Sequence, residues 1–99
     1  METKQNYAQQ AELLKALANP TRLQIVHNLF LTGCHNVSCM ERGTGMSQSC
    51  ISQHLQKLKA AGVVTAERSG TEVYYKAASR KVAGLVAALF DEEAGRYVL

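Results

Sequence analysis

The chain has 99 residues, of which 46% are hydrophobic and 19% charged, and its formal net charge is +3. This length indicates a single domain, residues 1–99, near the lower end of the size at which one hydrophobic core is stable alone. The charge excess neither requires nor excludes an acidic partner. No apolar run approaches the about 20 residues of a membrane-spanning helix. Residues 1–10 lack the basic and apolar regions of a targeting segment, so we expect a cytoplasmic protein.

Two helices are predicted in the first third of the chain. The first, residues 7–18, has apolar residues at helical spacing: Tyr7, Ala11, Leu14 and Leu17. Asn19 can cap the second helix, while Pro20 fits its first position, where a missing N–H costs nothing. This second helix extends to Gly33 and has a stripe of apolar residues: Leu23, Val26, Leu29 and Phe30.

A short helix is predicted within residues 34–45, weakened by Gly43 and Gly45. Ser47 can cap the next helix, residues 47–61, which ends at Gly62. The apolar residues of that helix form one face: Ile51, Leu55 and Leu58. Its opposite face is polar at the centre and basic at the edges: Ser49, Gln53 and Gln56, flanked by Ser52, Lys57 and Lys59.

The last third of the chain predicts a hairpin and a final helix. Residues 63–67 and 73–77 are rich in β-branched and aromatic residues and flank a polar tip, residues 68–72. Ser79 can cap the final helix, within residues 79–91, after which we expect a frayed end. An apolar stripe along this helix suggests a partner: Val82, Leu85, Val86, Leu89 and Phe90.

The predicted order is four helices, two strands and a helix, a mainly α fold with a β-hairpin. A polar helix directly before a hairpin is how a winged helix-turn-helix protein meets duplex DNA, with the helix in the major groove and the wing on the backbone or in the minor groove. Amides and hydroxyls can bond base edges and phosphates, while lysines and arginine neutralise charge. The candidate DNA contacts are Ser47, Gln48, Ser49, Ser52, Gln53, His54, Gln56, Lys57, Lys59, Arg68, Ser69 and Thr71. A solvated amphipathic helix is the alternative reading of residues 47–61 taken alone.

Three segments carry a resemblance to a known family. They are Leu14-Lys-Ala-Leu-Ala-Asn-Pro-Thr-Arg-Leu-Gln-Ile-Val26, Met46-Ser-Gln-Ser-Cys-Ile-Ser-Gln-His-Leu55 and Ala61-Gly-Val-Val-Thr-Ala-Glu-Arg-Ser-Gly-Thr-Glu-Val-Tyr-Tyr75. Together they resemble the ArsR/SmtB family of bacterial regulators over residues 11–90.

The resemblance implies a homodimer packed through the first and last helices, residues 47–61 as the recognition helix, and residues 63–77 as the wing. It also implies that the protein represses a promoter and that an inducer relieves this repression. The sequence does not identify the inducer. A twofold dimer would predict an inverted-repeat operator. The residues expected at the dimer interface are Leu14, Val82, Leu85, Val86, Leu89 and Phe90.

The usual metal sites of this family have no counterpart here. Members that sense soft metals carry Cys-Val-Cys in the third helix, where this chain has Asn36, Val37 and Ser38. Members that sense metals at the dimer interface use Asp, His and Glu in the last helix. This chain offers Ser79, Arg80, Lys81, Ala87 and Ala88 there. We therefore expect no metal and no cofactor at the positions used by the family.

Three cysteines leave several interpretations open. Cys34 and Cys39 can be a loop thiol and a small packed residue, a disulfide-forming redox pair, or metal ligands with the neighbouring His35. Cys50 lies in the first turn of the recognition helix, where the helix dipole favours a reactive thiolate, although a packing role is the simpler reading. His27 is expected to be partly buried and hydrogen-bonded.

An enzyme and a protein-interaction module are the two other classes of function for a domain of this size. An enzyme is disfavoured because the sequence has no paired carboxylates, phosphate-binding loop or nucleophile constellation. A protein-interaction module or anti-activator, which uses the recognition helix or the wing on another regulator, is the alternative to DNA binding.

Overall fold

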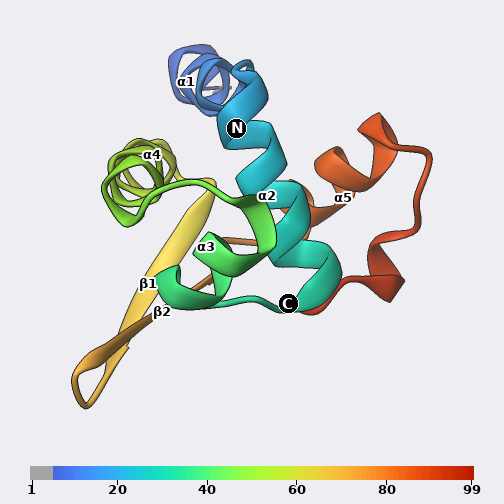
Figure 1. Cartoon of the computed structure of the whole chain (residues 1–99). Helices are drawn as coiled ribbons and strands as arrows, with labels where there is room; N and C mark the ends of the chain where they lie inside the picture. Colours follow the sequence, from blue (N-terminus) through green and yellow to red (C-terminus); the bar gives the residue numbers. More distant parts are fainter. Residues whose placement is uncertain (1–5) are drawn as a thin grey trace.

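The structure, a computed structural model, describes residues 6–99 and has the predicted order of helices and strands (Figure 1). Residues 1–5 of the expected domain lie outside the described part. In chain order the elements are α1 (Tyr7–Leu17), α2 (Pro20–Thr32), α3 (Val37–Thr44), α4 (Gln48–Ala60), β1 (Val64–Ser69), β2 (Glu72–Ala77), α5 (Arg80–Leu89) and the 3-10 turn η1 (Ala94–Arg96). The predicted mainly α fold with a β-hairpin is confirmed.

Side-chain caps set the starts of the helices. Oδ1 of Asn19 accepts a hydrogen bond from the backbone N–H of Arg22 at 3.0 Å, and Pro20 occupies the first position of α2. The hydroxyls of Ser47 and Ser79 accept equivalent hydrogen bonds at the starts of α4 and α5. These local signals explain why the helix starts could be predicted from sequence.

The core is built around α2, which runs through the middle of the molecule (Figure 1). Its Ile25, Val26, Leu29 and Phe30 have no exposed surface. The helix α4 and the hairpin lie on one side of α2, and α5 and the last residues lie on the other. Burial of each large apolar side chain stabilises the fold by about 1.5–3 kcal/mol. The other large side chains of this core are Met40, Ile51, Leu55, Leu58, Val63, Val64, Val82 and Val86.

The hairpin projects from the body of the molecule (Figure 1). Its strands are antiparallel, and Ser69 opposite Glu72 is the last pair before the tip. Gly70 and Thr71 therefore form a two-residue loop, and Gly70 takes a φ of 65°, which a residue with a side chain rarely adopts. The hairpin base is fixed to the core by Val64, so the exposed tip extends from a rigid support.

Of the four apolar residues at helical spacing in α1, only one faces the core of the protomer. Leu17 is buried, but Tyr7, Ala11 and Leu14 are exposed, with Tyr7 80% and Leu14 54% accessible. Helical spacing alone does not show which of two adjacent apolar stripes meets the core. The residues that α1 buries are Leu13, Ala16 and Leu17.

The apolar stripe predicted along α5 also divides into two parts. Val82 and Val86 are 1% and 0% exposed within the protomer, so they have no surface to offer a second copy. Their assignment to the dimer interface is therefore corrected, because the chain's own core already covers them. Leu89 is 57% exposed and Phe90 38%, while Leu85 is half-buried.

The frayed end predicted after α5 is also wrong for the last residues. The chain turns back through η1, and Tyr97 is only 7% exposed, with its ring 5.7 Å from that of Phe30. The backbone N–H of Val98 donates to the carbonyl of Phe30 at 2.7 Å. Gly33, at the end of α2, has a φ of 71°, and a Cβ there would lie 2.9 Å from Cγ1 of Val98. The last residues thus close over the end of α2.

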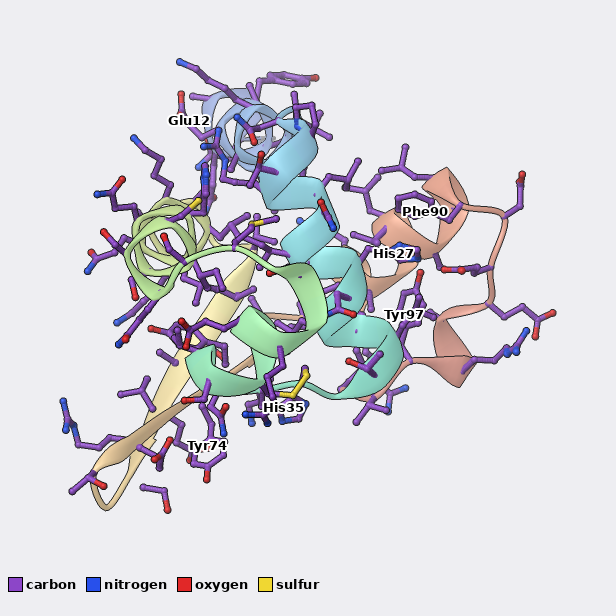
Figure 2. The ribbon with its side chains drawn as sticks, viewed as in Figure 1. Glu12, His27, His35, Tyr74, Phe90 and Tyr97 are labelled. Carbon is purple, nitrogen blue, oxygen red and sulfur yellow. A yellow bond between two sulfur atoms is a disulfide. The ribbon has the colours of Figure 1, made fainter. Side chains whose placement is uncertain are left out.

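A polar cluster ties this C-terminal segment to α2 (Figure 2). The Tyr97 hydroxyl donates to Oε1 of Glu92 at 2.6 Å, and Nε2 of His27 lies 2.8 Å from the same oxygen. The His27 ring stacks on Phe90 with centroids 3.8 Å apart. The hydrogen bonds from Tyr97 and His27 lower the pKa of Glu92, and burial together with Glu92 raises the pKa of Tyr97 to about 12. His27 is half-buried and hydrogen-bonded, as expected from the sequence.

Tyr97→Phe is expected to lower the free energy of unfolding at neutral pH by about 1.5 kcal/mol, because it removes a hydrogen bond to a carboxylate. The folded pKa of Tyr97 is raised above its ordinary value of 10.0, so this residue's contribution is complete below pH 10 and is lost as the pH rises toward 12. Denaturant unfolding between pH 7 and 11 should show less alkaline loss in the variant than in the wild type. Tyr74→Phe, at an exposed tyrosine of the hairpin, is the matched control. Equal pH profiles for the wild type and Tyr97→Phe would contradict this account.

Candidate nucleic-acid interface

The helix α4 divides cleanly into a buried and an exposed face. Ile51, Leu55 and Leu58 are completely buried, and their packing against the core fixes the rotation of the helix. The opposite side forms a shallow surface groove, whose lining residues are Ser49, Ser52, Gln53, Gln56 and Lys57. The structure thus brings the predicted polar face together on one exposed surface.

The flanks of α4 hold the other predicted contacts of this helix. Ser47, Gln48 and Lys59 are exposed. Oγ of Ser47 accepts from the N–H of Cys50 at 3.2 Å, which leaves its hydroxyl hydrogen available to a phosphate. His54 is only half-buried, and its Nδ1 is buried without a hydrogen-bond partner within residues 6–99. Its access to DNA is therefore more restricted than that of its neighbours.

The wing tip exposes Arg68, Ser69 and Thr71. Two carboxylates, Glu67 and Glu72, lie beside them, so the polar tip carries a single cation. Charge neutralisation along DNA must then come mainly from lysines and arginines elsewhere on the same side.

Two of the three cysteines are joined. Cys34 and Cys39 form a disulfide, with their Cα atoms 5.4 Å apart, which connects the loop after α2 to the first turn of α3. Figure 2 shows His35 beside this bond. The carbonyl of His35 accepts a hydrogen bond from the N–H of Tyr75 in β2 at 2.8 Å, so the bridged loop contacts the wing directly. Cys50 is a free, half-buried thiol.

Sequence reasoning missed a group of basic residues next to the predicted surface. Lys15 of α1 and Arg22 of α2 line a cleft with Lys57, which also borders the groove of α4. Only the fold brings these three residues together, since Lys57 follows Arg22 by 35 positions in the chain. The clue in the sequence was Arg22, a charged residue immediately after a strong helix start.

The described part of the chain shows neither a metal-binding cluster nor a membrane-spanning helix. Within residues 6–99, no group of three or more His, Cys, Asp and Glu side chains is placed to hold a metal ion. None of the helices in this same part combines the length and the apolar character of a membrane span.

Comparison with known proteins identifies the family. Residues 19–66 match the family described as bacterial regulatory proteins of the arsR family. The transcriptional repressor PagR of Bacillus anthracis is 40% identical over 76 residues, which are 77% of this chain and 76% of PagR. The chain belongs to the ArsR family. It is therefore a transcriptional regulator and not an enzyme.

Another relative, described as an HTH-type transcriptional regulator, and a solved structure extend the comparison. The regulator Rv0324 of Mycobacterium tuberculosis is 44% identical over 79 residues, 80% of this chain, but the chain spans only 34% of Rv0324. The structure of Mb0332 from Mycobacterium bovis is described as a homodimeric winged helix-turn-helix DNA-binding domain of a possible ArsR-family regulator. It has a TM-score of 0.77 and 38% identity, and the match covers 92% of this chain and 88% of Mb0332. The winged helix-turn-helix fold is thereby confirmed.

Proposed function

We propose that the chain is a cytoplasmic transcriptional repressor that binds an inverted-repeat operator as a homodimer. The observation that carries this proposal is the division of α4, whose apolar residues are buried while Gln53 and Gln56 lie on an exposed polar face. Such a helix fits the major groove, where a Gln amide can pair with N6 and N7 of adenine. The proposed contacts are Ser47, Gln48, Ser49, Ser52, Gln53, His54, Gln56, Lys57 and Lys59 on α4, and Arg68, Ser69 and Thr71 on the wing. PagR, a named repressor, and Mb0332, a DNA-binding domain, support this function.

Exposed apolar residues on α1 and α5 support the homodimer. Large side chains that remain accessible on one protomer are typical of a surface that a partner covers. Mb0332 is described as homodimeric, which favours the same assembly here. A twofold dimer sets its two α4 helices about 34–36 Å apart, one turn of DNA. The proposed interface residues are Tyr7, Leu14, Leu85, Leu89 and Phe90.

Fluorescence anisotropy tests this function. The purified protein is titrated onto labelled DNA from upstream of its own coding sequence and onto an unrelated duplex, at 50 and 200 mM salt. We expect the specific duplex to bind at least about 10³-fold more tightly, and both affinities to fall with salt. If neither duplex shows salt-dependent binding, the surface of α4 serves a protein partner instead, as in an anti-activator.

We also propose that the Cys34–Cys39 disulfide makes DNA binding responsive to redox state. Disulfides in the cytoplasm are usually transient and regulatory. Formation of this one is a thiol–disulfide exchange, in which two cysteine thiols and one small-molecule disulfide give the protein disulfide and two small thiols. The disulfide-bridged loop contacts the wing through the hydrogen bond from the Tyr75 N–H to the His35 carbonyl. In the oxidised protein this loop is therefore already ordered when DNA binds.

Reduction is expected to weaken operator binding about fivefold, since re-ordering one residue of the released loop costs about 1 kcal/mol. Anisotropy titrations of oxidised and reduced protein measure the difference. The double variant Cys34→Ser, Cys39→Ser should bind equally in both conditions, whereas Cys50→Ser, the matched control, should respond as the wild type does. Equal affinities for oxidised and reduced wild type would refute the proposal, and a persistent response in the double variant would assign it to Cys50.

A further inference from the structure

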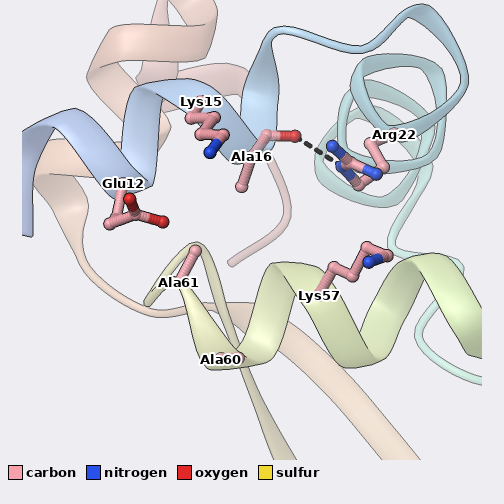
Figure 3. Close-up of a pocket in the computed structure, with 7 residues that line it drawn as sticks. All are labelled: Glu12, Lys15, Ala16, Arg22, Lys57, Ala60 and Ala61. Atoms are coloured by element: carbon pink, nitrogen blue, oxygen red, sulfur yellow. Dashed lines mark hydrogen bonds between the residues drawn. The ribbon is translucent and has the colours of Figure 1, made fainter.

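A cleft opens between α1, the start of α2 and the second half of α4 (Figure 3). Its volume is about 360 Å³. Three cations border it, Lys15, Arg22 and Lys57, with one carboxylate, Glu12. Its remaining lining residues are small: Ala16, Ala60 and Ala61. The cleft is thus basic at its border, with small side chains that leave room for a group from outside.

Arg22 is held in place by the protein itself. Its Nε donates to the carbonyl of Ala16 at 2.7 Å, and its backbone N–H donates to Asn19. Within residues 6–99, its two Nη groups have no hydrogen-bond partner. A guanidinium fixed at Nε with free Nη donors matches the oxygens of a phosphate and loses little freedom on binding.

The positive charge of the cleft is not neutralised internally. No carboxylate of residues 6–99 lies within 4.0 Å of a charged nitrogen of Lys15, Arg22 or Lys57. The ion pair found in this part of the chain joins His27 and Glu92, which lie outside the cleft. Figure 3 places Glu12 near Ala61, at the opposite end of the cleft from Arg22 and Lys57. An anion can therefore approach the arginine end without meeting that carboxylate.

The cleft is also continuous with the exposed face of α4. Lys57 borders both the cleft and the groove that contains Gln53 and Gln56. The wing tip supplies a single cation beside two carboxylates, so the fold needs other positive groups to neutralise a DNA backbone. A phosphate next to the major groove that α4 enters would meet the cleft at its Arg22 end.

We propose that this cleft binds a backbone phosphate of the operator, held by Arg22 and Lys57 with Lys15 at its border. This inference rests on the proposed DNA-binding function and extends its surface from α4 to α1 and α2. The contact positions α4 relative to the duplex and carries no sequence information.

The test compares the double variant Lys15→Gln, Arg22→Gln with Arg96→Gln, which removes one positive charge from the exposed η1, on the other side of α2 from α4 (Figure 1). The slope of log affinity against log salt should decrease by about 0.9 in the double variant, the value for one phosphate, and remain unchanged in the control. Between 50 and 200 mM salt, the affinity of the double variant should therefore fall by a factor about 3.5-fold smaller than the affinity of the wild type does. The single variant Lys15→Gln is also measured. This variant keeps the hydrogen bond between Arg22 and Ala16, so we expect it to fold normally.

A scan with single neutral methylphosphonates along the operator locates the contact. At one position, neutralisation should weaken wild-type binding several-fold and leave the double variant unaffected. Inorganic phosphate replacing chloride at equal ionic strength should compete more strongly with the wild type than with the double variant, because free phosphate and a backbone phosphate would share the cleft. If the two proteins differ in inorganic phosphate but at no methylphosphonate position, the cleft binds free anions only and the proposal is overturned; an unchanged salt slope would overturn it as well. Absence of any DNA binding by the wild type would instead refute the proposed function.

Discussion

Replacing Gln53 by alanine should reduce operator affinity by about 1–3 kcal/mol, a factor of about 5 to 150, while affinity for unrelated DNA stays nearly constant. The side chain is exposed at the centre of the polar face of α4, so its loss removes a base contact and leaves the core untouched. Anisotropy titrations with operator and unrelated duplexes measure both affinities.

Lys57→Ala provides the contrasting control. Lys57 lies on the same helix at the edge of that face, so its removal should weaken binding to all sequences by a similar factor and lower the salt dependence. Unchanged operator preference in Gln53→Ala would mean that base recognition lies elsewhere on the protein.

Replacing Leu14 and Leu89 together by glutamate should dissociate the proposed dimer and weaken operator binding by roughly 10²–10⁴-fold, because a monomer holds only one half-site. Both leucines are more than half exposed, at 54% and 57%, so the protomer itself should tolerate the change. Light scattering after size exclusion gives the mass, and anisotropy gives the affinity.

The matched control for this prediction is Leu31→Glu, an equally apolar, 42% exposed position on α2 that lies outside the proposed interface. It should remain dimeric. A variant with both glutamates that still has the mass of a dimer would place the interface on other elements.

The positions of the helices and strands could be predicted from the sequence more successfully than the side of each helix that faces the core. Asn19, Pro20, Ser47 and Ser79 act on backbone groups within a few residues, and such local effects can be recognised in a sequence. Which side of α1 or α5 meets the core depends on neighbours that are distant in the chain, and spacing alone does not contain that information. For the same reason Val82 was assigned to an interface although the core covers it.

The candidate site shows the same division. The polar face of α4 could be predicted because all its residues belong to one helix. The cleft could not, because Lys15, Arg22 and Lys57 come from three helices. The contact between His35 and Tyr75 depends on the packing of a loop against a strand, and the closing of the last residues over α2 needs Phe30 as a partner.

The residues of α4 that face outward contribute almost nothing to holding the molecule together. Substitutions at exposed positions usually change stability by less than about 0.5 kcal/mol, so Gln53 and Gln56 can be exchanged with little risk to folding. Gene duplication followed by changes at these two positions would give regulators with separate target sites and equal stability. The same freedom makes this helix a practical starting point for redirecting the protein to chosen DNA sequences.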